Sequence, residues 1–170
     1  MSNTRHELRL NLGFILHEEV GYSYDYSFDL ASARLGEDLE VNGLSGNLAV
    51  GRTAQGLLFS GRFAAGIELT CVRCLSIFEH GLAWSLTEHY AMNERSLSES
   101  GLLIPEDAQV DLRPLLREYA LLEVPINPIC RPDCRGLCPV CGQDLNERDC
   151  GHRREEGNSS FAALRDFLRE

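Results

Sequence analysis

Five of the seven cysteines and one of the five histidines lie in the stretch from Cys130 to His152, which reads CRPDCRGLCPVCGQDLNERDCGH. At its centre, Cys138 and Cys141 have the C-x-x-C spacing by which one tight turn directs two thiolates at one metal ion. Gly142 follows directly and lets the backbone turn back, so that amide N–H groups approach the sulfurs. The stretch therefore predicts a zinc knuckle in a module that a metal ion stabilises.

A complete zinc site needs two further ligands. Cys134 precedes Cys138 by four residues and Cys150 follows Cys141 by nine, so the predicted set is Cys134, Cys138, Cys141 and Cys150. Such an all-cysteine, closed set is typical of structural rather than catalytic zinc, and it predicts about one zinc ion per chain. Cys130 and His152 are the alternate ligands.

Disulfide bonds are the competing interpretation of the cysteines. Seven is an odd number, which does not suit a fully paired framework. The N-terminal residues 1–10 are polar and charged, unlike a secretory signal peptide. We therefore expect a reducing compartment, where metal binding is favoured over disulfides.

A second C-x-x-C pair, Cys71 and Cys74, lies between two predicted strands on a hairpin-like turn. The pair could supply metal ligands, either to the downstream knuckle or to a site of its own. It could be a redox dithiol, with Arg73 lowering a thiol pKa, although residues 76–80 resemble a strand rather than the helix that a thioredoxin-like motif needs. It could also be structural, with Cys71 continuing the buried face of the preceding strand.

The chain of 170 residues has 26 acidic residues against 16 basic ones, all arginine, for a net charge of −10. A protein that binds nucleic acid over its whole surface is usually basic, because it must neutralise phosphates. The acidic net charge of this chain instead favours a basic protein partner. No apolar run approaches the length that spans a bilayer. We expect a soluble cytoplasmic protein that neither enters a membrane nor takes a small-molecule substrate.

Period-two alternation is clearest in residues 43–90 and predicts an antiparallel meander with one buried face. A turn is expected at residues 53–56, and residues 5–16 and 22–28 also look extended. Glycines recur along these strands and indicate bulges or strong curvature. The predicted buried residues are Leu44, Leu48, Val50, Phe59, Phe63, Ala65, Ile67, Leu69, Leu82, Trp84, Leu86 and Tyr90.

The remaining segments predict an acidic loop at 93–109, a helix at 112–123 capped by Asp111, and a last helix at 159–169. An apolar stripe on the first helix is expected to pack on the sheet; it comprises Leu112, Leu115, Leu116, Tyr119 and Leu122. The expected fold is α+β: a curved antiparallel sheet or small barrel with a packed helix (residues 1–128), a cysteine-rich zinc module (residues 129–152) and the final short helix.

The sequence lacks three common catalytic motifs. It has no phosphate-binding glycine loop, no G-x-S-x-G elbow and no H-E-x-x-H helix. The histidines outside the cysteine stretch have no obvious serine, cysteine or carboxylate partner. We therefore expect a protein that is not an enzyme.

The order of motifs resembles that of a known family. A glycine-rich β region ends in C-x-R-C at Cys71, an acidic loop follows, and D-L-x-P-L-L-x-E begins at Asp111. The motif C-x-x-x-C-R-G-L-C-P-V-C-G-x-D-L-N then begins at Cys130. From about residue 40 to its C-terminus, the chain resembles the bacterial YceD family, the large ribosomal RNA subunit accumulation proteins. Two features depart from the pattern: Cys150-Gly151-His152 stands where many members have C-x-C, which leaves His152 as a substitute ligand, and the last helix lacks an Asp-Pro start.

This resemblance implies a role in the synthesis, processing or stability of 23S rRNA and in large-subunit assembly. The acidic charge favours action through a ribosomal or assembly protein, and a direct rRNA contact would have to be local. The arginines around the knuckle are the candidates for that contact: Arg131, Arg135, Arg148, Arg153 and Arg154. The alternatives are a zinc-linked thiol redox switch and a metal-stapled adaptor for protein interactions.

Overall fold

The computed structural model describes residues 7–98 and 100–152. The chain divides into two compact units, which we call the sheet unit (residues 1–69 and 77–128) and the cysteine-rich unit (residues 70–76 and 129–170). The turn at residues 70–76 thus belongs with the C-terminal cysteines, although it lies within the range 1–128 expected for the β domain. The predicted helix at 159–169 and two of the candidate arginines, Arg153 and Arg154, lie outside the described residues.

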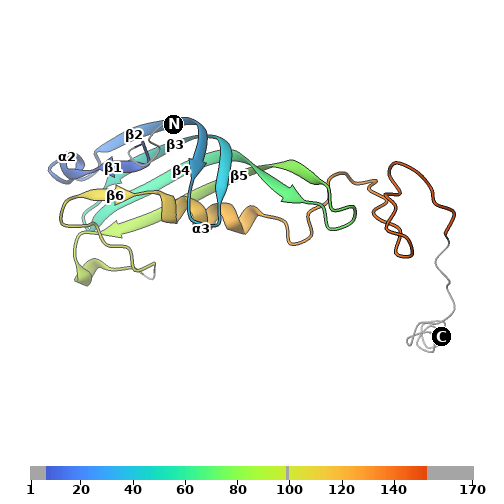
Figure 1. Cartoon of the computed structure of the whole chain (residues 1–170). Helices are drawn as coiled ribbons and strands as arrows, with labels where there is room; N and C mark the ends of the chain where they lie inside the picture. Colours follow the sequence, from blue (N-terminus) through green and yellow to red (C-terminus); the bar gives the residue numbers. More distant parts are fainter. Residues whose placement is uncertain (1–6, 99, 153–170) are drawn as a thin grey trace, which may run out of the picture. The chain divides into compact units, whose positions relative to one another are not determined.

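Four long strands form one sheet in the order β2-β3-β4-β5 (Figure 1). The strands β2, β3 and β4 pair antiparallel. The alternation in residues 43–90 correctly predicted three of the strands, and the aromatic stretch 22–28 is part of the fourth. The strands are β2 (Ser23–Arg34), β3 (Glu40–Arg52), β4 (Gly56–Thr70) and β5 (Ile77–Ala91).

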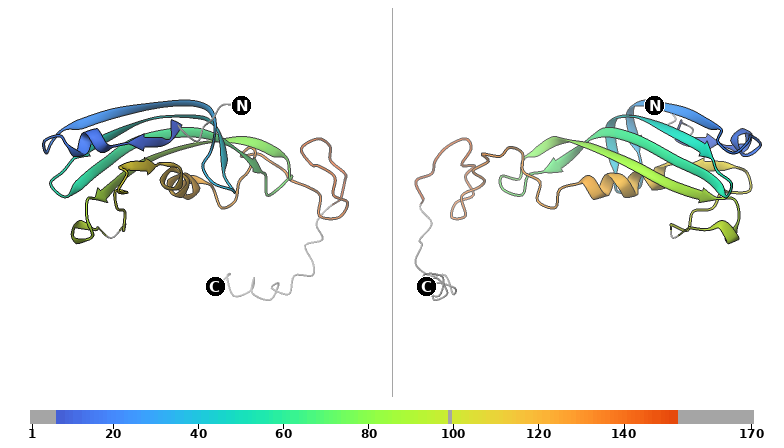
Figure 2. Two further views of the ribbon diagram at one scale, coloured as in Figure 1. Left: turned by 60° about the vertical axis from the view of Figure 1, so that its left-hand side comes forward. Right: turned by 180° about the vertical axis from the view of Figure 1, so that it is seen from behind.

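The sheet is open rather than closed. Its edges are β2 and β5, and the residues that the structure describes form no closed barrel, so the small-barrel alternative is wrong. Four strands are too few to close around a packed interior. The helix α3 (Arg113–Glu123) covers one face instead, together with the antiparallel pair β1 (Arg9–Asn11) and β6 (Gln109–Asp111) (Figure 2).

The hydrophobic core lies between this face and α3, as the apolar stripe predicted. Alternate residues of β3, including Leu44 and Leu48, are fully buried, whereas Ser45 and Asn47 between them are exposed. From α3 the buried residues are Leu115, Leu116 and Ala120. Leu122 was expected in the same stripe, but this position faces away from the core and is 80% exposed.

Two local expectations were wrong in detail. Within the described part of the segment, residues 7–16, the strand is limited to Arg9–Asn11. The Asn11 Oδ1 accepts the Gly13 N–H at 3.0 Å, and the short helix α2 (Gly13–Leu16) begins there. Asp111 is not the N-cap of α3 but the last residue of β6; the cap position is Leu112. The Asp111 carboxylate still accepts the Arg113 N–H at 3.0 Å. The acidic loop contains one 3-10 turn, η1 (Glu94–Ser96).

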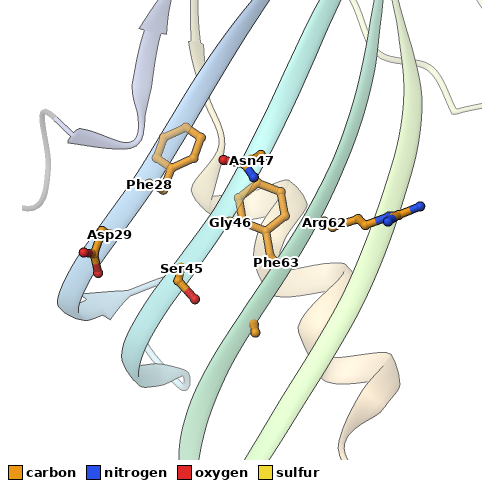
Figure 3. Close-up of a pocket in the computed structure, with 8 residues that line it drawn as sticks. Phe28, Asp29, Ser45, Gly46, Asn47, Arg62 and Phe63 are labelled. Carbon is orange, nitrogen blue, oxygen red and sulfur yellow. The ribbon is translucent and has the colours of Figure 1, made fainter.

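Two glycines in β3 show why this strand needs small residues. Gly43 has a φ of +59° and lies at the bulge between Asn42 and Ser45, as the glycine pattern suggested. At Gly46, a Cβ atom would lie 2.4 Å from the ring of Phe63, so glycine lets that ring lie against β3. The neighbouring shallow hollow has one positive and one negative side chain and therefore no preference for an anion or a cation (Figure 3). Its lining residues are Phe28, Asp29, Ser45, Gly46, Asn47, Arg62, Phe63 and Ala64.

Truncating a buried leucine of α3 is expected to destabilise the sheet unit strongly. Leu116 is 0% exposed, so Leu116→Ala should lower the free energy of unfolding by about 2–5 kcal/mol. The exposed Leu122 on the same helix offers the matched control, because Leu122→Ala should change it by less than about 0.5 kcal/mol. Urea unfolding followed by the fluorescence of the buried Trp84 measures both. Equal effects would contradict the packing of α3 described above.

Candidate metal centres

Four thiols from two distant parts of the sequence meet in the cysteine-rich unit. We call this group the first cluster; it comprises Cys71, Cys74, Cys130 and Cys134. The turn between β4 and β5 supplies one pair, and the segment after Pro128 supplies the other. All four sulfur atoms lie within 4.8 Å of one another. The turn at residues 70–76 therefore contributes ligand candidates to a group shared with the C-terminal segment.

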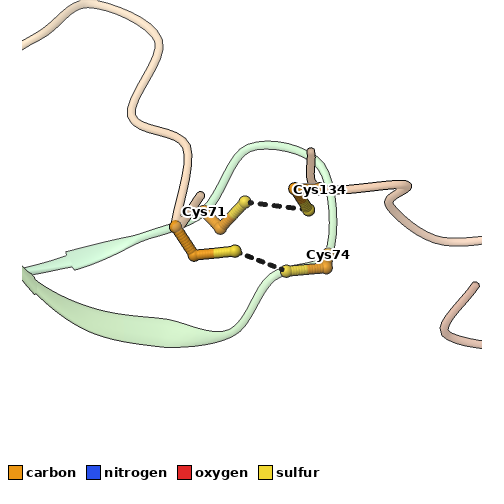
Figure 4. A group of neighbouring side chains, drawn as sticks. Cys71, Cys74 and Cys134 are labelled. Atoms are coloured by element: carbon orange, nitrogen blue, oxygen red, sulfur yellow. Dashed lines mark hydrogen bonds between the residues drawn. The ribbon is translucent and has the colours of Figure 1, made fainter. Parts of the chain in front are cut away.

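The sulfur separations fit a metal ion better than disulfide bonds. The Cys71 and Cys134 Sγ atoms are 3.8 Å apart (Figure 4), and those of Cys74 and Cys130 are 3.6 Å apart. A disulfide would need about 2.05 Å. Bonds of about 2.3 Å from four sulfurs to a tetrahedral zinc ion separate the sulfurs by about 3.8 Å. The first cluster therefore has the geometry of a closed, all-thiolate metal site.

A second group of four candidate ligands comes from one continuous segment. The second cluster comprises Cys138, Cys141, Cys150 and His152, whose ligand atoms also lie within 4.8 Å of one another. The His152 Nδ1 is 3.3 Å from the Cys150 Sγ and 3.9 Å from the Cys138 Sγ. Three sulfurs and one imidazole nitrogen form a common ligand set for a structural zinc ion.

Both C-x-x-C pairs lie on turns with the same backbone hydrogen bonds. The Leu75 N–H donates to the Cys71 carbonyl at 2.9 Å, and the Gly142 N–H donates to the Cys138 carbonyl at 2.9 Å. The N–H of each first cysteine in turn donates to the carbonyl five residues later, at 2.9 Å and 2.8 Å. The residue after each second cysteine has a positive φ, +61° at Leu75 and +73° at Gly142. The chain thus contains two knuckles with the same backbone hydrogen bonds and the same positive φ after the second cysteine.

The sequence reveals only one of these knuckles directly. A glycine at position 142 indicates a positive φ in the downstream turn. The upstream turn has leucine at the same place, Leu75, and because leucine rarely adopts a positive φ this conformation could not be predicted from the sequence. The spacing of Cys71 and Cys74 was the remaining signal, and it left three interpretations open. The geometry favours the metal-ligand interpretation over the redox dithiol, since the turn leads into β5 and not into a helix.

Replacing Gly142 by alanine is expected to weaken the second cluster. No atom lies within 4 Å of where the new Cβ would be, so the cost arises from the positive φ alone, about 1–2 kcal/mol. Metal affinity should fall roughly fivefold to thirtyfold. Titration of the metal-free chain with zinc against a competing chelator measures the change. Val140→Ala in the same turn is the control; a loss as large in that variant would argue against backbone strain as the cause.

The structure divides the predicted ligands between two groups. Cys138, Cys141 and Cys150 lie together, but Cys134 lies in the first cluster, so the predicted set of four is not brought together. The chain turns between Cys134 and Cys138 at Gly136, which has a φ of +74°. The alternate ligands are divided as well: Cys130 lies in the first cluster and His152 in the second.

The surroundings of the thiols lower the pKa of Cys71 and, through the Ser76 hydroxyl, that of Cys74 in the first knuckle, and they lower the pKa of Cys138 in the second. Burial acts to raise the pKa of Cys71, but backbone N–H groups, including that of Arg73 at 3.4 Å, outweigh it and lower this pKa to about 6. The backbone N–H groups of Cys141 and Val140 lower the pKa of Cys138 to about 6. Burial raises the pKa of Cys130 to about 12. Since thiolate is the ligand form, these N–H groups prepare Cys71 and Cys138 to bind a cation.

The cysteine-rich unit has almost no apolar core of its own. Among its described residues, only Cys71, Cys74, Cys134, Cys138 and Gly136 are buried. None of them belongs to the hydrophobic core, which consists of residues of the sheet unit. A segment this small usually needs a metal ion or disulfides in place of a core. A metal ion bound at each cluster would therefore take the place of an apolar core in this unit.

The candidate RNA-contact arginines that the structure describes are partly engaged with acidic neighbours. The Arg131 Nε lies 3.5 Å from an Asp133 carboxylate oxygen, and the Arg135 Nη2 lies 3.6 Å from one of Asp149. Arg148 makes no ion pair with any described residue. These side chains are exposed, so the pairs are weak and would compete only modestly with a phosphate.

Comparison with known proteins places the chain in a family. A family model described as "Large ribosomal RNA subunit accumulation protein YceD" matches residues 59–168. The chain belongs to the YceD family. The YceD match includes most of β4, all of β5 and α3, and all seven cysteines.

Relatives of this YceD chain occur in bacteria and chloroplasts. A Mycobacterium tuberculosis (strain ATCC 25618 / H37Rv) protein named only as uncharacterized is 32% identical over 161 residues, 91% of this chain and 74% of that protein. An Arabidopsis thaliana protein is 38% identical over 60 residues, 35% of this chain and 19% of that protein. Its name is "Large ribosomal RNA subunit accumulation protein YCED homolog 1, chloroplastic". No solved structure matches the chain.

No helix in the described part of the chain is long and apolar enough to cross a membrane.

Proposed function

We propose that this chain is a non-enzymatic factor that supports the accumulation of 23S rRNA and the assembly of the large ribosomal subunit. The YceD match over residues 59–168 carries the proposal, since that family is described by the accumulation of this RNA. The chloroplast relative carries the same description in its name. The two clusters support a structural rather than a catalytic role, because four protein ligands leave a metal ion no open position for a substrate.

Zinc is the metal that we propose for both clusters. Sulfur-rich sets with one or no histidine suit zinc, and the sulfur separations of the first cluster agree with tetrahedral coordination. The first cluster would use Cys71, Cys74, Cys130 and Cys134, and the second would use Cys138, Cys141, Cys150 and His152. The proposal therefore raises the expected content from one zinc ion to two per chain.

The charge distribution supports a protein partner for the sheet unit. This unit holds 18 of the 26 acidic residues but only 8 of the 16 arginines, so the whole net charge of −10 lies in it. Such a surface repels RNA and attracts a basic protein, as many RNA-binding proteins are. The cysteine-rich unit has eight acidic residues and eight arginines, and any direct rRNA contact is better supported there.

Depleting the protein in the organism that encodes it tests the functional proposal. The ratio of 23S to 16S rRNA should fall, and the wild-type chain supplied in trans should restore it. Val140→Ala, which leaves all eight candidate ligands in place, should restore it as well. An unchanged ratio together with normal large subunits would refute the proposed role.

A crosslinked pull-down, divided into nuclease-treated and untreated halves, distinguishes the two kinds of partner. The proposal predicts that large-subunit proteins remain bound after nuclease treatment and are lost when acidic residues of the sheet unit are replaced. Loss after nuclease, with recovery of crosslinked 23S rRNA, would instead indicate binding through RNA. Substitution of Arg148 would then be the next test.

A zinc-linked thiol switch is the second candidate, and the exposure of the second cluster favours it. Cys141 and His152 of the second cluster are exposed, whereas none of the four cysteines of the first cluster is exposed. A peroxide could therefore oxidise two thiolates of the second cluster to a disulfide, with reduction of the peroxide to water and release of the zinc ion. Zinc release measured with a colorimetric chelator tests this; retention of both ions under mild peroxide would exclude it.

A further inference from the structure

Arg73 connects the two knuckles through its carbonyl and the two ligand pairs of the first cluster through its side chain. The Leu137 N–H, just before the second knuckle, donates to the Arg73 carbonyl in the first knuckle at 3.0 Å. The approach is close, because a Cβ on Gly136 would lie 2.9 Å from the same carbonyl oxygen. The Arg73 Nη1 donates to the Cys134 carbonyl at 2.9 Å and so links the two ligand pairs of the first cluster.

A side-chain amide connects the second knuckle to a sulfur of the first cluster. The Asn146 Nδ2 lies 3.6 Å from the Cys134 Sγ and 2.7 Å from the Asp144 Oδ1. The Asn146 Oδ1 accepts the Arg135 N–H at 2.8 Å. Because a backbone N–H only donates and an ionised carboxylate only accepts, these contacts fix the orientation of the amide, and an N–H is directed at the sulfur.

The backbone of the second knuckle determines where Asn146 lies. Leu137 and Asp144 form an antiparallel bridge, the Cys138 N–H donates to the Gln143 carbonyl at 2.8 Å, and the Leu145 N–H donates to the Gly136 carbonyl at 2.9 Å. This short hairpin contains the ligands Cys138 and Cys141. The described residues give it no buried apolar side chain, so a metal ion at the second cluster is what would hold it in shape.

We propose that the two metal centres are coupled through Asn146 and Arg73. A metal ion in the second cluster fixes the hairpin, which then presents the Asn146 N–H to the Cys134 sulfur and the Leu137 N–H to the first knuckle. The first cluster consequently binds its metal more tightly when the second is filled. By linkage, metal in the first cluster tightens the second by the same factor. This inference rests on the proposed zinc binding.

The physical reason lies in the charge of a four-thiolate centre. Four thiolates around a divalent ion have a net charge of −2, and an N–H donor directed at a sulfur offsets part of it. Hydrogen bonds to ligands also fix their orientation, and their loss typically lowers metal affinity by about 10–100-fold. Asn146 is thus a positioning residue for the first cluster although the second knuckle carries it.

Site-resolved metal binding by the full chain tests the coupling. Cobalt(II) serves as the probe, because S4 and S3N sites differ in their visible spectra, and a competing chelator gives the affinity of each site. Asn146→Ala and Asn146→Asp both remove the donor to sulfur, and the second variant keeps the acceptor for the Arg135 N–H. Cys141→Ser disables the second cluster. Glu147→Ala, an exposed neighbour on the same segment, is the matched control.

The coupling predicts that both Asn146 variants lower the cobalt affinity of the first cluster by about 10–100-fold, with a smaller loss at the second cluster. Cys141→Ser should lower the first-cluster affinity at least as much, and Glu147→Ala should leave both sites unchanged. First-cluster affinities within about twofold of wild type in the Asn146 and Cys141 variants would overturn the coupling while leaving the zinc proposal intact. A wild-type chain that takes up no metal would overturn both. None of these readouts depends on ribosome assembly.

Discussion

Removing the metal with a strong chelator under reducing conditions is expected to unfold the cysteine-rich unit and leave the sheet unit folded. Only four cysteines and Gly136 are buried among the described residues of the cysteine-rich unit. Without metal, little burial therefore offsets the conformational entropy that this unit loses on folding. Structural zinc contributes on the order of 10 kcal/mol to modules of this kind near pH 7. The sheet unit has its own core, which includes Leu48, Phe59 and Leu116.

Two probes follow the two units separately. Trp84 is the single tryptophan, is 5% exposed and lies in the core of the sheet unit, so its fluorescence should change little on chelation. Amide NMR signals of residues 129–152 should collapse toward random-coil positions and return when zinc is restored. Dispersed signals from this segment in the metal-free chain would contradict the account, and so would a cooperative loss of the tryptophan signal.

Disabling one knuckle at a time is expected to remove one zinc ion at a time. Cys74→Ser removes a ligand of the first cluster and Cys141→Ser a ligand of the second. The intact cluster should bind its ion more weakly because of the coupling, but at zinc concentrations far above its dissociation constant each variant should still hold one ion per chain instead of two. The double variant should hold none. Element analysis after desalting under reducing conditions measures the content. Each single loss should melt local structure in the cysteine-rich unit and spare the signal of Trp84.

Val140→Ala is the control for these cysteine variants, because Val140 lies in the second knuckle, is 65% exposed and supplies no ligand. It should retain both ions. A single ion in both the wild type and Cys74→Ser would instead mean that the first cluster holds no metal. Cys71 and Cys74 would then be a structural pair or a redox dithiol, the two other interpretations that their spacing allowed.

The fold of the sheet unit could be predicted in large part from alternation. Large apolar residues such as Leu44, Leu48 and Trp84 alternate with polar or small residues, which is the pattern of a strand with one buried face. Whether the sheet closes into a barrel depends on the number of strands and on what covers its face. Neither can be predicted from the pattern of a single segment. The position of Leu122 was predicted wrongly for a similar reason: it continues the helical spacing of α3, but its side chain faces away from the core, whereas Tyr119 and Val124 on either side of it pack against the core.

The presence of candidate metal ligands could be predicted from the sequence, but their grouping could not. Spacing places Cys138 beside Cys141 because one turn holds both. The spacing does not indicate whether Cys134 lies in the same group as Cys138. In the structure the chain turns at Gly136, between these two residues, and Cys134 lies in the first cluster. Cys71 and Cys130 are more than fifty residues apart, so only the tertiary structure can bring them together. Asn146 carried no signal beyond its place in the D-L-N motif.

The most direct test of this account is the metal content and coordination of the full chain purified under reducing conditions. Element analysis should find two zinc ions per chain, and X-ray absorption at the zinc edge should report mainly sulfur, about seven sulfur ligands and one nitrogen ligand for the two ions together. One ion bound by four sulfurs would instead support the single site first predicted from the spacing. A metal-free chain with an ordered cysteine-rich unit would contradict the account altogether.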